Sequence, residues 1–131
     1  MIAVAELQRI AQARLDDAKA LLSAGRFDGA TYLCGYAIEL ALKFRICQIL
    51  NWPEFPSTRG DFQDYRSFQT HDLDVLLHLS GQEARIKRDQ FTEWSIVAEW
   101  DPEVRYSVVG NVLQATAESM VRAAEGLLKI L

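Results

Sequence analysis

Near the middle of the chain, an arginine and a histidine stand five residues apart, Arg66 and His71, in the stretch RSFQTH. An imidazole can take the proton of a ribose 2′-hydroxyl or protonate a leaving oxygen. A guanidinium can hold a phosphate and its developing negative charge. The pair is therefore a candidate catalytic site for RNA cleavage without a metal ion. One arginine and one histidine at this spacing also occur by chance in many chains, so a structural role stays open.

The local sequence around His71 predicts its protonation state. Thr70 can cap a helix that starts at His71, with Asp72 and Asp74 in its first turn. At that position the positive end of the helix dipole would favour the neutral imidazole, the form that acts as a base.

Glu39 and Lys43 are two charges in a helix that is otherwise apolar on almost every side. Their i,i+4 spacing, with the acid first, suits a surface pair worth about 0.2–0.5 kcal/mol. A helix this apolar is usually central in a bundle, where a lone charge is costly and must be paired. Arg45 and Arg105 are then candidate partners, and we expect a charged cluster of Glu39, Lys43, His71 and Arg105 at a pocket that binds a nucleotide or phosphate.

Arg105 and Tyr106 follow the helix-start signal Asp101-Pro102-Glu103. Arg105 could bind a phosphate, and Tyr106 could stack on a base or donate from its hydroxyl. The alternative is structural: Arg105 would pair with a carboxylate such as Glu39, and Tyr106 would fill the edge of the core.

The two histidines of the chain, His71 and His78, with Asp74 between them, could be read as a metal site. The histidines are two helical turns apart and cannot easily hold one ion, and structural zinc takes four ligands. An exposed Asp74–His78 pair worth about 0.3–0.5 kcal/mol is the favoured interpretation. We expect no metal ion and no cofactor.

Composition indicates a single domain over residues 1–131 with one core. The net charge of −4 means that a global basic field for nucleic acid is absent, so any RNA contact must come from a local patch. Cys34 and Cys47 lie in one predicted helix, on the order of 20 Å apart at 1.5 Å per residue, which excludes a disulfide between them. Buried reduced thiols, with no leader-like or membrane-spanning run, predict a cytoplasmic protein with no membrane partner.

Apolar residues recur at steps of three and four in three long segments, which predicts three long helices. The first spans residues 2–24 and ends at Gly25. The second runs from Asp28, as its N-cap, to about residue 50, and forms an antiparallel hairpin with the first. The third spans about 112–131.

The middle of the chain predicts shorter elements. The irregular stretch 51–69 is rich in aromatic residues and should pack back on the domain. Short helices are expected over 71–79, ended by Ser80-Gly81, and near 88–99, followed by a single turn after Asp101. No strand is predicted. The fold class is all-α, a four- to five-helix up-and-down bundle.

The order of these pieces resembles the HEPN family of small helical proteins. The resemblance rests on the helix over 29–43, the start Thr70-His71-Asp72-Leu73 after a variable loop, Arg105-Tyr106, and an alanine-rich closing helix. Ribonuclease members of the family carry Arg, four to six residues, then His, usually in a later helix. Arg66 and His71 have this spacing, but they lie before the third helix, and no histidine follows in the later helices.

The resemblance implies a homodimer, often paired with a small nucleotidyltransferase. In such pairs the HEPN member is a metal-independent endoribonuclease toxin and the nucleotidyltransferase is its antitoxin. Other members act as non-catalytic modules that bind a nucleotide or a partner, and the location of Arg66 and His71 keeps that alternative open. A structural helical adaptor is the third interpretation.

Overall fold

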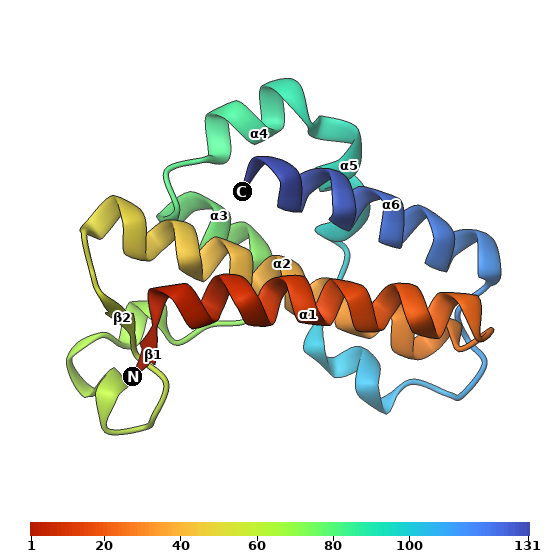
Figure 1. Cartoon of the computed structure of the whole chain (residues 1–131), viewed down its shortest axis with the longest axis horizontal. Helices are drawn as coiled ribbons and strands as arrows, with labels where there is room; N and C mark the ends of the chain where they lie inside the picture. The colour runs from red at the N-terminus through yellow and green to blue at the C-terminus, as the bar shows by residue number, and fades with distance from the viewer.

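A computed structural model describes residues 1–131 and is dominated by helices (Figure 1). The α-helices are α1 (Val4–Ser23), α2 (Phe27–Leu50), α3 (Leu73–Leu79), α4 (Glu83–Asp89), α5 (Phe91–Val97) and α6 (Gln114–Ile130). Short 3-10 helices are η1 (Asp61–Asp64), η2 (Arg66–Phe68) and η3 (Pro102–Tyr106), and two antiparallel two-residue strands are β1 (Ile2–Ala3) and β2 (Glu54–Phe55). The predicted all-α class is confirmed.

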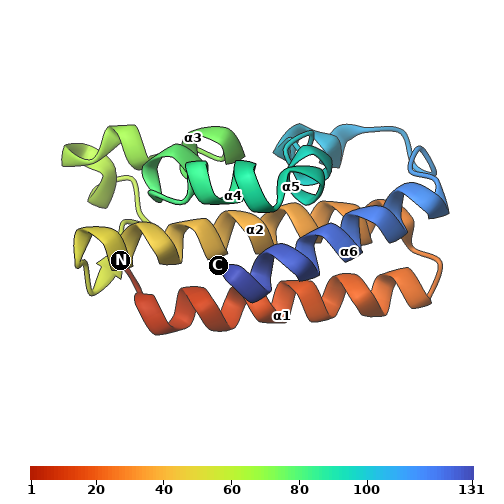
Figure 2. The ribbon, with the colours of Figure 1, turned by 90° about the horizontal axis from the view of Figure 1, so that it is seen from above.

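The helices α1 and α2 form the predicted antiparallel hairpin, and α2 is the central element (Figure 2). Gly25 ends the first arm with a φ of 76°, a left-handed conformation that glycine adopts without strain. In Figure 2, α1 lies on one side of α2, and α3, α4 and α5 lie on the other, while α6 crosses over the hairpin. Because α2 is enclosed in this way, its apolar residues face neighbours in several directions, as its sequence predicts.

A close contact between α2 and the segment after α5 depends on a glycine. A Cβ atom at Gly35 would overlap the indole ring of Trp100. The absence of a side chain there lets Trp100 lie against α2, where its Nε1–H donates to the backbone oxygen of Tyr32 at 3.1 Å. This contact fixes the start of η3 relative to α2.

The stretch 51–69 packs back on the bundle through its aromatic side chains, as predicted. Trp52 lies 5.2 Å from Tyr65 and 5.0 Å from Phe68, measured between ring centroids. Phe55 is buried at the centre of this group, and β2 pairs with β1 through the register Ile2↔Phe55. The segment that leads to His71 is therefore anchored to the domain.

The prediction that Asp28 caps α2 is wrong. The helix already begins at Phe27, and no side chain caps it. The Asp28 carboxylate instead accepts from the backbone N–H of Gly110 at 2.7 Å and of Val112 at 3.0 Å. These two hydrogen bonds lower the pKa of Asp28 and hold the segment between η3 and α6 against α2.

The prediction that Thr70 caps the third helix is also wrong. Asp72 is the N-cap of α3, and its carboxylate accepts from the backbone N–H of Asp74 at 2.9 Å and of Val75 at 3.2 Å. Thr70 Oγ1 instead accepts from the backbone N–H of Asp72 itself at 3.1 Å, before the helix begins. His71 consequently precedes the helix and does not occupy its first turn.

The helix predicted near 88–99 is two short helices, so the chain has six α-helices and not four or five. The backbone leaves the helical conformation at Gln90, with φ −132° and ψ 36°. The break separates α4, which buries Ile86, from α5, which buries Trp94 and Val97 and packs against α6. None of the helices combines the length and the apolar character needed to cross a membrane.

Candidate functional site

Glu39 is the most deeply buried charged side chain of the protein and the centre of the candidate site. Only 3% of it is exposed, and it lies on the central helix α2. Its Oε2 accepts from Lys43 Nζ at 3.1 Å, and its Oε1 lies 2.7 Å from His71 Nδ1. One buried carboxylate thus joins a lysine of its own helix to a histidine 32 residues away in the chain.

His71 sits at the surface over this carboxylate, with 60% of its side chain exposed. Because a carboxylate can only accept, the contact with Glu39 requires a proton on Nδ1. The neutral ring then has its lone pair on Nε2. A carboxylate behind one imidazole nitrogen fixes both the tautomer and the orientation of the ring, which is the arrangement of a general base.

Lys43 supplies the positive charge that a buried carboxylate needs. Its side chain is 12% exposed, and Nζ also lies 5.4 Å from the centroid of the Phe55 ring. Phe55 belongs to the aromatic group that anchors residues 51–69. The same packing therefore shields the Glu39–Lys43 pair from water and places the segment that carries His71.

Arg66 lies on η2, in the same anchored segment as His71, but is exposed and makes no ion pair or side-chain hydrogen bond. Phe68, two residues on, packs against Trp52 and Phe55. The backbone near Arg66 is thus fixed, while its guanidinium is free to meet an anion.

Arg105 and Tyr106 lie on η3 and do not join the Glu39 cluster. The guanidinium of Arg105 lies 4.8 Å from the centroid of the Tyr106 ring. The hydroxyl groups of Tyr106 and then Tyr32 beside it raise the pKa of Arg105. Tyr106 is 74% exposed, so it does not fill the edge of the core. Of the four residues expected to cluster, the structure brings together Glu39, Lys43 and His71 and leaves Arg105 apart.

Sequence analysis missed two tyrosines on the same face of α2 as Glu39. Tyr32 Oη donates to Tyr36 Oη at 3.2 Å, and both side chains are partly buried. The hydrogen bond from Tyr32, followed by burial, raises the pKa of Tyr36 to about 12. The spacing of positions 32, 36, 39 and 43 could have revealed them, because steps of four, three and four keep residues on one helical face.

The predicted Asp74–His78 pair is absent. Asp74 accepts from the indole Nε1–H of Trp94 at 3.1 Å, and His78 lies 3.6 Å from Glu83. No group of three or more His, Cys, Asp or Glu side chains is placed to hold a metal ion.

The main cavities lie beside the segment that Asp28 holds, away from His71. One of about 340 Å³ is lined by Asp28, Tyr32, Arg105 and Val108, among others. A second of about 870 Å³ extends between that segment and the helices α5 and α6. Neither of these two cavities is lined by His71 or Glu39.

Comparison with known families identifies the hairpin. Residues 4–51 match the HEPN domain. The match spans α1, α2 and Asn51, which ends α2 in a left-handed conformation. It confirms the resemblance to the HEPN family over this hairpin. No curated protein and no solved structure matches the chain.

Some of the candidate residues lie within the segment that matches the HEPN domain, and others follow it. Glu39 and Lys43 lie within the matched hairpin, whereas Arg66, His71, Arg105 and Tyr106 follow it. The hairpin therefore contributes the buried carboxylate, and the later segments contribute the exposed groups.

Proposed function

We propose that this HEPN-like protein is a metal-independent endoribonuclease in which His71 is the general base and Glu39 positions it. The observation that carries the proposal is the 2.7 Å contact between His71 Nδ1 and the buried Oε1 of Glu39. A histidine held only for packing would not need a buried carboxylate behind an exposed ring. The charge of that carboxylate is compensated by Lys43 and leaves the free nitrogen of the ring for chemistry.

The reaction requires one nucleophile and one leaving group, both supplied by RNA. His71 Nε2 takes the proton of a 2′-hydroxyl, whose oxygen then attacks the adjacent phosphorus. The bond from phosphorus to the 5′-oxygen breaks, and that oxygen leaves with its electron pair and takes a proton from solvent. The products are a 2′,3′-cyclic phosphate and a 5′-hydroxyl. Arg66 is the proposed partner for the phosphate, since its guanidinium has no competing acid.

The biological setting follows from the family resemblance. We propose a cytoplasmic homodimer that acts as the toxin of a toxin–antitoxin pair, with a nucleotidyltransferase as antitoxin. An acidic chain without a global basic field suits a nuclease whose contacts with RNA are few and local.

A second function, a non-catalytic module that binds a nucleotide and acts with a nucleotidyltransferase, is favoured by one observation. The cavity of about 340 Å³ is lined by both Tyr32 and Arg105 and not by His71. A nucleotide has a planar base, which an aromatic side chain can contact, and a phosphate, which a guanidinium group can bind. In this case His71 would be dispensable for binding.

The test is cleavage of a labelled single-stranded RNA by purified protein in the presence of a chelator. Wild type should produce fragments with 2′,3′-cyclic phosphate ends, and His71→Ala should lose about 100-fold or more of the rate. His78→Ala is the matched control, because His78 is exposed and lies apart from Glu39. It should keep the wild-type rate.

Three outcomes distinguish the proposals. Equal cleavage by wild type and His71→Ala would remove His71 from the mechanism. Folded wild type that cleaves no RNA but binds a nucleotide, with loss of binding in Arg105→Ala, would establish the binding module. Loss of activity in His78→Ala as well would show that the assay does not report on the proposed site.

A further inference from the structure

Four polar side chains form one row along α2, from Tyr32 through Tyr36 and Glu39 to Lys43. Steps of four, three and four residues keep the row on a single helical face. Hydrogen bonds link neighbours at both ends of the row: Tyr32 to Tyr36 at 3.2 Å and Lys43 to Glu39 at 3.1 Å. We call these four residues the α2 polar row.

The row connects the two groups of candidate residues. His71 contacts the row at Glu39, and Arg105 lies beside it at Tyr32. Seven residues separate Glu39 from Tyr32, which is about 10 Å along a helix axis at 1.5 Å per residue. Arg105 thus approaches α2 about two helical turns from His71, on the same side of the helix.

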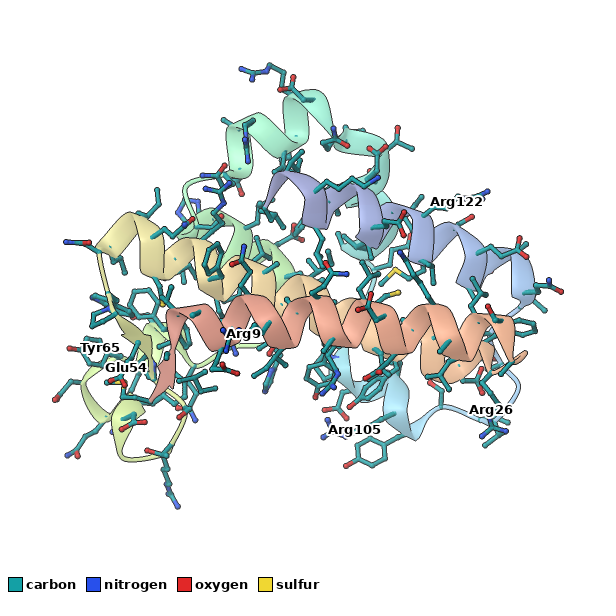
Figure 3. The ribbon with its side chains drawn as sticks, viewed as in Figure 1. Arg9, Arg26, Glu54, Tyr65, Arg105 and Arg122 are labelled. Atoms are coloured by element: carbon teal, nitrogen blue, oxygen red, sulfur yellow. The ribbon has the colours of Figure 1, made fainter.

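The end of the row at Arg105 carries groups that suit an anionic strand. Arg105 and Tyr106 are exposed, and Figure 3 shows Arg105 projecting from the lower edge of the molecule. No carboxylate lies within ion-pair distance of Arg105, although Glu103 is near enough to contribute to its raised pKa. Between the two ends, the Tyr36 hydroxyl receives a hydrogen bond from Tyr32 and keeps its own proton to donate.

We propose that a single-stranded RNA substrate lies on the surface parallel to the α2 polar row, between the exposed side chains of His71 and Arg105, with Arg105 binding a phosphate about three nucleotides from the bond that His71 cleaves. The spacing follows from about 10 Å divided by the ~3.4 Å rise per nucleotide of a stacked strand. Tyr106 stacks on a base at this subsite, which requires an unpaired base and selects single strands over duplexes. This inference rests on the proposed ribonuclease activity and adds to it the length and form of the substrate.

The test compares cleavage of an RNA dinucleotide with cleavage of an unstructured RNA octanucleotide. Wild type should cleave the octanucleotide with the higher kcat/KM, because only the longer strand reaches Arg105. Arg105→Ala should lower kcat/KM for the octanucleotide about tenfold, the range of one charge-assisted contact at a surface, and leave the dinucleotide unchanged. The salt dependence of the octanucleotide kcat/KM should weaken in the variant, with a log–log slope reduced by about 0.7.

Arg122→Ala is the matched control. Arg122 is also exposed and makes no ion pair, but it projects from α6 at the opposite edge of the molecule (Figure 3). It should leave both substrates and the salt slope unchanged. Equal losses on both substrates in Arg105→Ala, or equal losses in both variants on the octanucleotide, would overturn the subsite.

Failure of the ribonuclease proposal gives a different result. If wild type cleaves neither substrate, binding of the octadeoxynucleotide, which lacks the 2′-hydroxyl, is measured by fluorescence anisotropy. Binding that weakens in Arg105→Ala but not in Arg122→Ala supports the strand path without the cleavage step. If the octadeoxynucleotide does not bind, or binds equally well to wild type and Arg105→Ala, the strand path is overturned as well.

Discussion

Glu39 is a carboxylate inside an otherwise apolar helix, and its two partners determine what its removal does. Lys43 is nearly as buried as Glu39, so the substitution Glu39→Gln leaves an almost buried ammonium without a counter-charge. We expect a loss of about 3 kcal/mol in the free energy of unfolding, the lower end for breaking a buried pair. Urea denaturation monitored by tryptophan fluorescence measures this loss.

The double variant Glu39→Gln/Lys43→Met removes both charges while keeping side chains of similar size. Removing both charges should recover part of the stability lost in the single variant, because no ion is then left unpaired. Glu6→Gln, which breaks an exposed pair with Arg9, should change stability by no more than about 0.5 kcal/mol. A double variant less stable than Glu39→Gln would contradict the assignment of Lys43 as the compensating charge.

The sequence permits prediction of the members of this cluster but not of all its contacts. Glu39 and Lys43 are related by helical period, so their pairing is local and predictable. Residue types suggested the contact with His71, but its geometry could not be predicted, because it depends on how residues 51–69 fold back. Arg105, which was expected in the same cluster, lies on η3 beside Tyr32, seven residues before Glu39 on α2. The position of η3 is set by the contact of Trp100 with Gly35. This is a tertiary contact with no local signature in the sequence.

At the scale of elements, the position of η3 depends on how closely Trp100 approaches α2. Gly35→Ala places a methyl group where the indole ring lies, so the ring or the helix must move. We expect the free energy of unfolding to fall by about 1–3 kcal/mol, the usual effect of overpacking, although alanine is the better helix former. Urea denaturation gives the value, and a changed tryptophan emission spectrum of the folded state would report the displaced ring.

Gly126→Ala is the matched control in another helix. A Cβ at Gly126 would lie 3.8 Å from Glu93, an ordinary contact, so alanine should stabilise α6 by about 0.5–1 kcal/mol. Opposite signs at the two glycines would support the close approach of Trp100. Stabilisation of both would show that Trp100 does not occupy the space beside Gly35.

Element types were predicted well from the sequence, and element ends less well. The three long helices have clear apolar periods, so both hairpin arms and the closing helix were expected. The predicted N-caps at Asp28 and Thr70 are wrong for different reasons: Asp72, two residues after Thr70, caps α3, and Asp28 has distant partners. Asp28 binds the backbone at Gly110 and Val112, more than 80 residues away, and no local pattern indicates such a partner.

At the scale of the whole molecule, all six helices contribute to one core of 24 buried residues that includes both cysteines. Burial raises the pKa of the Cys34 thiol to about 12 and that of Cys47 to about 11. In the unfolded chain both thiols ionise near their ordinary value of about 8.5. Alkaline solution should therefore favour the unfolded state.

The sign of this effect follows from proton counting. Below about pH 8.5 both thiols are protonated in either state, and their contribution to stability is fully present. As the pH rises toward 11 and 12, the unfolded chain loses two protons that the folded protein keeps, so the free energy of unfolding falls by up to about 1.4 kcal/mol per pH unit for each thiol. Urea denaturation under reducing conditions at pH 8, 9 and 10 measures the slope of the free energy of unfolding against pH.

The variant Cys34→Ala/Cys47→Ala is the control, because it keeps Tyr36 and every other titrating group. Its free energy of unfolding should be lower through lost packing, but should fall less steeply with pH than that of wild type. Parallel curves would mean that the thiols ionise as readily in the folded protein, and that the core around α2 admits water.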